Sequence, residues 1–242
     1  MLIEMTQTED IRIIRLANGG ANILSISNGM AAALFDAFND ALTYPSCKAI
    51  IIAGAGRMFC GGADLKDLPI AGELRDIFDA IEQSAKPVVV AMHGMALGGA
   101  VELAMAGHGR IAHSDTRFSL PEVNLGLLPG LGGTQRLPRL VGAEAALEMM
   151  LAGKTINAEE ALAAGYADML ADDPLASAIE VATKLAQKPG HGSAVTKTLC
   201  NGSLSQRVRA ADAAGLEAFL DSWFSTAAQQ SIQALAAKLA GK

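Results

Sequence analysis

The sequence has few cysteines, no long apolar run and no excess of basic side chains. Cys47, Cys60 and Cys200 are widely spaced and form no CxxC pair, so neither a disulfide framework nor a structural zinc site is indicated. No apolar run reaches the roughly 18 residues of a bilayer-spanning helix. The N-terminal segment lacks the basic start and apolar run of a signal peptide. We therefore expect a soluble, cytoplasmic protein in a reducing compartment.

The charge balance restricts the partners of the protein. The formal net charge is −6 and the isoelectric point is about 5.2, so neither nucleic acid nor an anionic membrane surface would be attracted by the surface as a whole. With 242 residues, of which 51% are hydrophobic, the chain can bury a sizeable core. A polyanionic ligand would have to be bound by a local group of residues.

Several catalytic motifs are absent. The chain contains no GxxxxGK[ST], GxGxxG, HExxH or GxSxG, which removes the main signals for a P-loop, a dinucleotide fold, a zincin and a nucleophile elbow. The four histidines are scattered, and His93 at a predicted strand end is typical of a packing or hydrogen-bonding residue. Cys60 could be imagined as a nucleophile, but no histidine lies at an evident spacing from it, which favours a small apolar filler. Acid–base chemistry remains.

The order of the predicted elements indicates layered α/β structure. Short apolar runs predict buried strands, and apolar residues at helical spacing predict helices. A strand, a glycine turn and a helix in succession are typical of α/β crossovers, in which ligands bind at the carboxyl ends of the strands. The predicted strands cover 11–16, 49–53, 86–92, 110–112 and 117–120, and the predicted helices cover 27–42, 74–84, 142–151, a segment starting at Asn157, 173–188 and two segments within 193–242.

A glycine-rich stretch, Gly94–Ala106, is the most informative part of the chain. It is predicted to be a turn that opens a short apolar helix, whose unpaired N–H groups could bind a polarised oxygen. Glu102 is the one charged side chain in this helix. It could simply complement the helix dipole, or it could be catalytic. Residues 94–106 by themselves do not decide between the two.

Two further features bear on this choice. A second glycine-rich loop, Arg57–Lys66, follows another predicted buried strand and could bring N–H groups close to a ligand. Glu122 lies twenty residues after Glu102, beside a third glycine-rich segment, although an acid after a proline is also an ordinary helix start. Two carboxyls over one site can act as acid and base if their environments separate their pKa values.

Three long motifs in order resemble those of the enoyl-CoA hydratase/isomerase (crotonase) family. They are Gly56–Leu65, Lys86-Pro87 leading to Ala96–Ala104, and Pro121–Val123 leading to Leu128–Leu137. The resemblance runs from about Ile11 to at least Asp168. The sequence around Gly107–Ala112 and the short interval from Asp64 to Lys86 are most similar to the hydratase portion of multifunctional β-oxidation enzymes. It implies an α/β fold with a crotonase-like ββα spiral core over 1–188. It also implies a C-terminal helical region, 189–242, that serves oligomerisation and covers the active site.

The resemblance implies a role for four residues in hydrating a trans-2-enoyl-CoA to a 3-hydroxyacyl-CoA. The N–H groups of Ala63 and Gly99 would form an oxyanion hole for the thioester oxygen, where removing one donor costs roughly 3 kcal/mol of transition-state stabilisation. Glu102 would orient and deprotonate the water that attacks the β-carbon. Glu122 would deliver the proton to the α-carbon. Coenzyme A enters as part of the substrate, and neither a metal nor a separate cofactor is expected.

The resemblance also implies a set of residues that contact the acyl-CoA. Arg57 or Lys66 would lie near phosphate, although a solvated surface charge explains either side chain equally well. Homotrimers or homohexamers assembled through the C-terminal helices would explain the apolar face formed by Leu216, Phe219, Trp223, Phe224, Ile232 and Leu235. The implied substrate-binding residues are Ala21, Ile23, Arg57, Gly61, Ala63, Asp64, Leu65, Lys66, Leu97, Gly98, Pro121, Leu128 and Gly130.

Two other functions stay open at this point. The same oxyanion hole serves several reactions, so a Δ3-Δ2 enoyl-CoA isomerase or another crotonase-type reaction of an acyl-CoA is the enzymatic alternative. Isomerases of this family commonly lack one of the two acids. A non-catalytic acyl-CoA-binding subunit is the second alternative, and the presence of both acids counts against it. The interval from Asp64 to Lys86 is shorter than in many single-function hydratases, which leaves the acyl chain length open.

Overall fold

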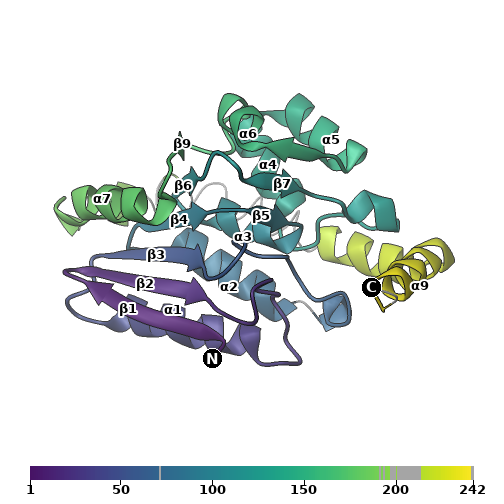
Figure 1. The fold of residues 1–242 in the computed structure, drawn as a ribbon, viewed down its shortest axis with the longest axis horizontal. Coiled ribbons are helices and arrows are strands. Elements are labelled where there is room, and N and C mark those ends of the chain that lie inside the picture. The colour runs from purple at the N-terminus through teal and green to yellow at the C-terminus, as the bar shows by residue number, and fades with distance from the viewer. Residues whose placement is uncertain (71, 191, 193, 197–199, 201–213, 241–242) are drawn as a thin grey trace.

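A six-stranded sheet forms the centre of the protein (Figure 1). The computed structural model describes residues 1–240 apart from 71, 191, 193, 197–199 and 201–213. In this sheet β1 pairs with β2 in antiparallel fashion and every other pairing is parallel. The strands, in spatial order, are β1 (Ile3–Thr8), β2 (Ile11–Leu16), β3 (Ala49–Gly54), β4 (Val88–Met92), β6 (Gly109–Ala112) and β9 (Met169–Leu170).

The central strands are apolar throughout because helices cover both faces of the sheet. Successive side chains of a strand point to opposite faces of the sheet. Alternate residues of β3 therefore pack into the hydrophobic cores on its two sides. Ile50 and Ile52 pack with the side of the molecule that holds α1 (Met30–Thr43) and α2 (Gly72–Gln83), whereas Ile51 packs toward α7 (Pro174–Ala186). The strands predicted at 11–16, 49–53 and 110–112 are confirmed, and the strand predicted at 86–92 begins two residues later, at Val88.

A small second sheet carries the glycine-rich stretch. It consists of β5 (Met95–Leu97), β7 (Arg117–Ser119) and β8 (Thr155–Asn157), in the order β5-β7-β8. The expectation that residues 94–98 form only a turn is therefore wrong in part, since Met95–Leu97 pairs in parallel with β7. The chain then turns at Gly98 into α3 (Gly99–Ala106), whose residues are all buried.

The remaining helices surround this second sheet and α3. The helix expected from Asn157 is confirmed: the side chain of Asn157 accepts from the N–H of Glu160 in a reciprocal capping box. The helix over Gly133–Val141 was not predicted, because it begins inside a glycine-rich loop and contains Pro138. These elements are η1 (Leu68–Ile70), η2 (Glu122–Leu125), α4 (Gly133–Val141), α5 (Ala143–Ala152) and α6 (Ala158–Ala164).

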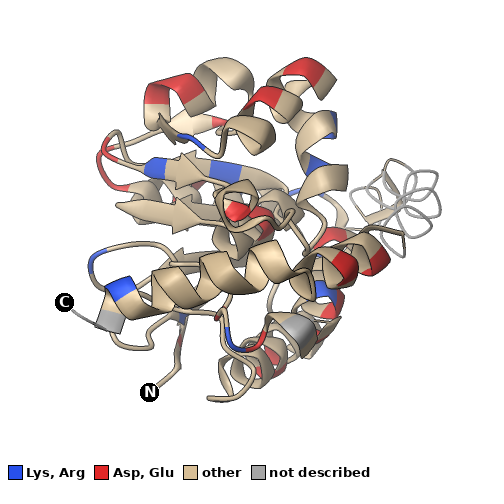
Figure 2. Ribbon diagram, turned by 90° about the vertical axis from the view of Figure 1, so that its right-hand side faces the viewer, with Lys and Arg blue, Asp and Glu red and all other residues tan. Residues whose placement is uncertain are grey.

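The C-terminal part crosses one side of the molecule. Residues 214–223 are helical, and α9 (Thr226–Ala240) follows them and lies against η2. Figure 2 shows α9 as a long, nearly uncharged helix across the front of the view. Phe219 and Trp223 are buried and stacked on each other. Phe224 is 71% exposed in the single chain, so its packing against a neighbouring subunit stays a prediction. The helix expected from Ser193 lies largely outside the described residues.

Among the residues that the structure describes, no helix is long and apolar enough to cross a membrane.

Candidate active site

Glu102 is a buried carboxylate held by the backbone of another segment. It lies in the first turn of α3 and is only 1% exposed. Its Oε1 accepts hydrogen bonds from the N–H groups of Leu131 (2.8 Å) and Gly133 (2.7 Å). Burial raises the pKa of Glu102 to about 7, while these two hydrogen bonds and the nearby cations Arg136 and Arg75 oppose the rise. Glu102 is therefore poised to gain or lose a proton near neutrality.

Glu122 is the second carboxyl of the site, and its surroundings differ. It begins η2, and its Oε2 is enclosed without a hydrogen-bond partner among the described residues. Burial, followed by the negative charge of Glu102, raises the pKa of Glu122 to about 8. Because no N–H or O–H group of the described residues donates to Oε2, the neutral form of Glu122 is favoured over the ionised form. The two carboxyls titrate as an interacting pair in which Glu102 ionises more readily.

Two backbone N–H groups meet where the glycine-rich loops approach each other. A Cβ on Gly99 would lie 3.1 Å from the nitrogen of Ala63, and a Cβ on Gly62 would lie 3.4 Å from the nitrogen of Gly99. Neither the N–H of Ala63 nor that of Gly99 has an acceptor within the described part of the chain. Such a pair of unpaired donors can bind one polarised carbonyl oxygen.

Glycine is required at position 98 by both backbone and space. Gly98 has φ 51° and ψ −119°, a conformation that residues with a Cβ rarely adopt. A Cβ there would also lie 2.7 Å from Oε1 of Glu122. The glycine turn therefore brings the start of α3 directly against the second carboxyl.

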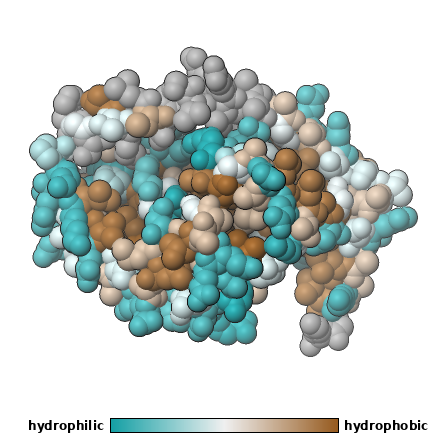
Figure 3. Space-filling view, turned by 90° about the horizontal axis from the view of Figure 1, so that it is seen from above, coloured by the Kyte–Doolittle hydropathy of each residue, from teal (hydrophilic) through white to brown (hydrophobic). Residues whose placement is uncertain are grey.

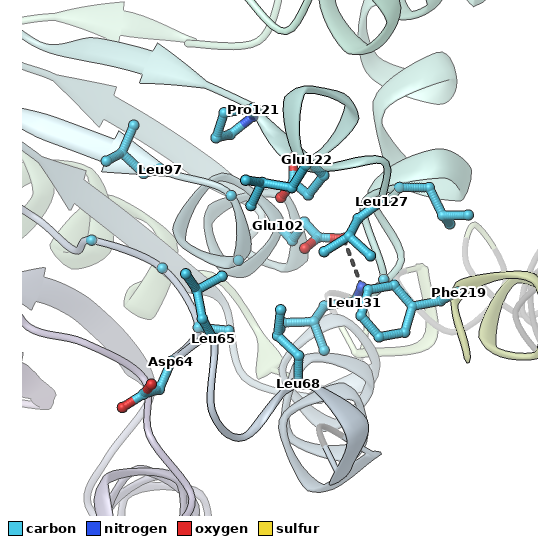
Figure 4. A pocket seen from close by; sticks show the side chains of 18 of the residues that line it. Asp64, Leu65, Leu68, Leu97, Glu102, Pro121, Glu122, Leu127, Leu131 and Phe219 are labelled. Atoms are coloured by element: carbon cyan, nitrogen blue, oxygen red, sulfur yellow. Dashed lines mark hydrogen bonds between the residues drawn. The ribbon is translucent and has the colours of Figure 1, made fainter. Parts of the chain in front are cut away.

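These groups open into one pocket of about 360 Å³ (Figure 4). Leucine is the most frequent residue in its lining, and its charged lining residues are Asp64, Arg75, Glu102 and Glu122. Glu102 and Glu122 project into it from different elements, and Leu127, Leu131 and Phe219 lie beyond them on the side away from Asp64. Such an apolar pocket with a few convergent polar groups suits a ligand with a hydrocarbon tail and one reactive polar group.

The structure brings most of the predicted site residues together. Three predicted residues do not line the pocket: the carbonyl of Ala21 accepts from the N–H of Gly61 (2.7 Å), and the side chains of Arg57 and Lys66 are exposed. Their contact with coenzyme A stays a prediction. The predicted residues that do line the pocket are Ile23, Gly61, Ala63, Asp64, Leu65, Leu97, Gly98, Gly99, Glu102, Pro121, Glu122, Leu128 and Gly130.

Two residues that the sequence left ambiguous are structural. Burial raises the pKa of the Cys60 thiol to about 12, and its Sγ donates to the carbonyl of Asn22 (2.9 Å), so Cys60 is not a thiolate nucleophile. Nε2 of His93 pairs with the carbonyl of Gly56 at 3.0 Å. Within the described residues, no three His, Cys, Asp or Glu side chains cluster closely enough to hold a metal ion.

Sequence reasoning missed part of the pocket wall. Leu68 follows the second glycine loop, Arg75 lies on α2, and Leu127 and Leu131 flank the third glycine segment. Leu216, Phe219 and Leu235 were named as members of the apolar face of the C-terminal helices but not as substrate-binding residues, and all three line the pocket. No local signal identifies these residues as pocket residues, because long-range packing alone brings them there.

The fold and the site together define a class of protein: an α/β chain that places two carboxyls and two converging N–H groups in one apolar pocket. The model for the family described as "Enoyl-CoA hydratase/isomerase" matches residues 6–241. The chain belongs to this family, and its fold is the crotonase fold. The resemblance read from the three motifs is confirmed.

Relatives and solved structures agree with this assignment. The chain is 44% identical over 185 residues to the peroxisomal bifunctional enzyme of Danio rerio, a match covering 74% of this chain and 25% of the relative. It is 39% identical to a probable enoyl-CoA hydratase of Bacillus subtilis (strain 168), covering 77% and 75% of the two chains. A solved enoyl-CoA hydratase/isomerase from Mycobacterium paratuberculosis superposes with a TM-score of 0.86 at 28% identity, covering 96% of this chain and 97% of that one. The chain thus spans about a quarter of the bifunctional enzymes that it matches.

Proposed function

We propose that the protein is an enoyl-CoA hydratase, which adds water reversibly to a trans-2-enoyl-CoA to give a 3-hydroxyacyl-CoA in fatty acid β-oxidation. The observation that carries this proposal is the pair of enclosed carboxyls, Glu102 and Glu122, over one pocket, beside the unpaired N–H groups of Ala63 and Gly99. The matching family and the names of the relatives support it.

The proposed reaction follows from the different surroundings of the two acids. The N–H groups of Ala63 and Gly99 bind the thioester oxygen and stabilise the enolate-like charge that develops on it. Ionised Glu102 takes a proton from water as the water oxygen bonds to the β-carbon. Neutral Glu122 gives its proton to the α-carbon, so that one water is added across the double bond. After the product leaves, a proton passes through solvent from Glu102 to Glu122, which restores the starting state.

Substituting each acid tests this proposal. We expect both Glu102→Gln and Glu122→Gln to lower kcat for crotonyl-CoA hydration by about 100-fold or more, because each removes one proton-transfer group. The measurement is the loss of ultraviolet absorbance of the conjugated thioester, with the unfolding midpoint of each variant as a check on folding. Near-wild-type rates in both variants would refute the mechanism. Faster turnover of 3-enoyl-CoA than of 2-enoyl-CoA by the wild type would favour the isomerase.

The proposal also covers the oligomeric state of the protein, its location in the cell and whether it requires a cofactor. We expect a homotrimer or homohexamer, and exposed apolar side chains on α5, namely Leu147 (54%) and Leu151 (69%), support self-association. Apolar patches interrupt the polar surface on the face seen in Figure 3. Light scattering after gel filtration gives the assembly state. We further expect a cytoplasmic location, checked by cell fractionation, and activity that survives chelation, because hydration is redox-neutral and this mechanism assigns no step to a metal.

A further inference from the structure

The loop that orients Glu102 is itself held by two arginines. Glu102 depends on the segment Gly130–Gly133, because both hydrogen bonds to its Oε1 come from the N–H groups of Leu131 and Gly133. On the other side of this loop, Nη2 of Arg75 donates to the carbonyl of Gly130 (2.5 Å) and Nη1 of Arg136 donates to the carbonyl of Leu131 (2.8 Å). The loop therefore lies between a carboxylate and two cations.

One peptide group connects Arg75 with Glu102 directly. The carbonyl of Gly130 and the N–H of Leu131 belong to the same peptide, and in a trans peptide they point in opposite directions. Arg75 binds its oxygen and Glu102 accepts from its nitrogen. Hydrogen bonds in a chain polarise one another in a low-dielectric interior. The Arg75 cation therefore strengthens the hydrogen bond that the N–H of Leu131 donates to Glu102.

Arg136 supports the same loop from α4. Its side chain is fully buried, forms ion pairs with Asp79 and Glu82 of α2, and donates to the carbonyl of Leu131. A buried guanidinium with several partners is fixed in position. Its removal would take an ion-pair partner from both Asp79 and Glu82, so Arg136 is a poor site for a clean test. Arg75 is only partly buried and is the better one.

We propose that Arg75 is a positioning residue for the reaction: through the Gly130–Leu131 peptide it fixes the orientation of Glu102 and favours its ionised form. This inference rests on the proposed hydratase function. The charged groups that face Glu102 are Glu122 from η2, Arg75 from α2 and Arg136 from α4, with Asp79 and Glu82 behind Arg136. Arg75 acts on the general base and takes no part in proton transfer itself.

The test compares Arg75→Met with Arg75→Lys and with Arg139→Met. Arg139 is the matched control, because it is another arginine that contacts α2, through Glu82 (2.7 Å), and it forms no hydrogen bond with residues 130–133 within the described part of the chain. We expect Arg75→Met to lower kcat about tenfold with KM changed less than twofold, and to move the acidic limb of the pH profile of kcat/KM to higher pH. Arg75→Lys should recover part of the loss, and Arg139→Met should match the wild type. Unchanged kcat and pH profile in Arg75→Met, or the same change in Arg139→Met, would overturn the proposal.

Amide hydrogen exchange in the substrate-free protein provides a second readout. The N–H of Leu131 should exchange faster in Arg75→Met than in the wild type and Arg139→Met, because its hydrogen bond to Glu102 is weakened. Equal protection in all three proteins would contradict the proposal. This measurement needs no turnover, so a wild type that fails to hydrate crotonyl-CoA would refute the proposed function, whereas unchanged exchange would refute the positioning role.

Discussion

Glu102 and Glu122 show how surroundings give two identical carboxyls different roles. Glu102 accepts hydrogen bonds from two backbone N–H groups and lies near two cations, and all four groups favour its charged form. Glu122 has an enclosed oxygen without a partner and faces the charge of Glu102. Since the pKa values differ in this order, base and acid are assigned by the local environment rather than by residue type.

This assignment predicts a bell-shaped dependence of kcat/KM on pH. Glu102, with its pKa raised to about 7, must be ionised, so activity falls as the pH drops below that value. Glu122, with its pKa raised to about 8, must be protonated, so activity falls as the pH rises above it. Each limb should approach about a tenfold change per pH unit. Initial rates of crotonyl-CoA hydration from pH 5 to 10 test this, and a flat profile would contradict the assignment.

Among the elements, the loop that carries Ala63 is positioned by a buried acid. Asp67 is 4% exposed and accepts hydrogen bonds from the hydroxyl of Ser25 and the N–H groups of Ile26 and Ser27. Leu24 then pairs with both neighbours of Ala63: its N–H donates to Gly62 and its carbonyl accepts from Asp64. The N–H of Ala63 is thereby left facing the pocket.

The helical segment 214–223 supplies a wall of the pocket through Phe219. Phe219 is 3% exposed. Its ring lies so close to Gly130 that a Cβ on residue 130 would be 2.9 Å from Cδ2 of the ring. We expect Phe219→Ala to enlarge the apolar part of the pocket and to raise kcat/KM for long-chain relative to four-carbon enoyl-CoA. It should also cost about 3–5 kcal/mol of stability.

Phe224→Ala is the matched control for this prediction, since Phe224 lies in the same part of the chain but is 71% exposed. It should change stability by no more than about 0.5 kcal/mol and leave the chain-length preference as in the wild type. A panel of trans-2-enoyl-CoA substrates from four to sixteen carbons measures the preference. The prediction fails if the ratio of long-chain to short-chain activity is the same in the wild type and Phe219→Ala.

For the whole molecule, the two acids lower the stability of the fold as the pH rises. Their native pKa values lie above that of an unfolded glutamate, about 4.3. Between these values the native state holds protons that the unfolded state has released, so their contribution to stability is full below about pH 4 and is lost as the pH rises to about 8. The site is thus maintained at some expense of stability.

We therefore expect Glu122→Gln to raise the unfolding midpoint at pH 8 by about 2–4 °C, with a much smaller gain at pH 5. The exposed Glu180→Gln on α7 is the control and should show no such pH-dependent gain. Thermal unfolding of the three proteins at both pH values is the measurement. A gain for Glu122→Gln that is equal at pH 5 and pH 8 would show that the carboxyl is not destabilised by burial.

Elements with local signals could be predicted from residue order alone. Buried strands such as Ile50–Ile52 are apolar throughout because both faces are covered, and the capping box at Asn157 lies within four residues. Glu102 stood out as one acid in an apolar helix. The three ordered motifs identified the family, which the family match confirmed.

How these parts come together as a site depends on the packing of segments that are distant in the chain. The N–H groups of Ala63 and Gly99 are 36 residues apart in the numbering yet adjacent in space, and Arg75 reaches the carbonyl of Gly130 across 55 residues. Short strands such as Met95–Leu97 depend on a partner strand rather than on their own composition. Residue type and spacing reveal local conformation, whereas pKa values, pocket walls and converging donors arise from long-range packing, which sets burial and distance.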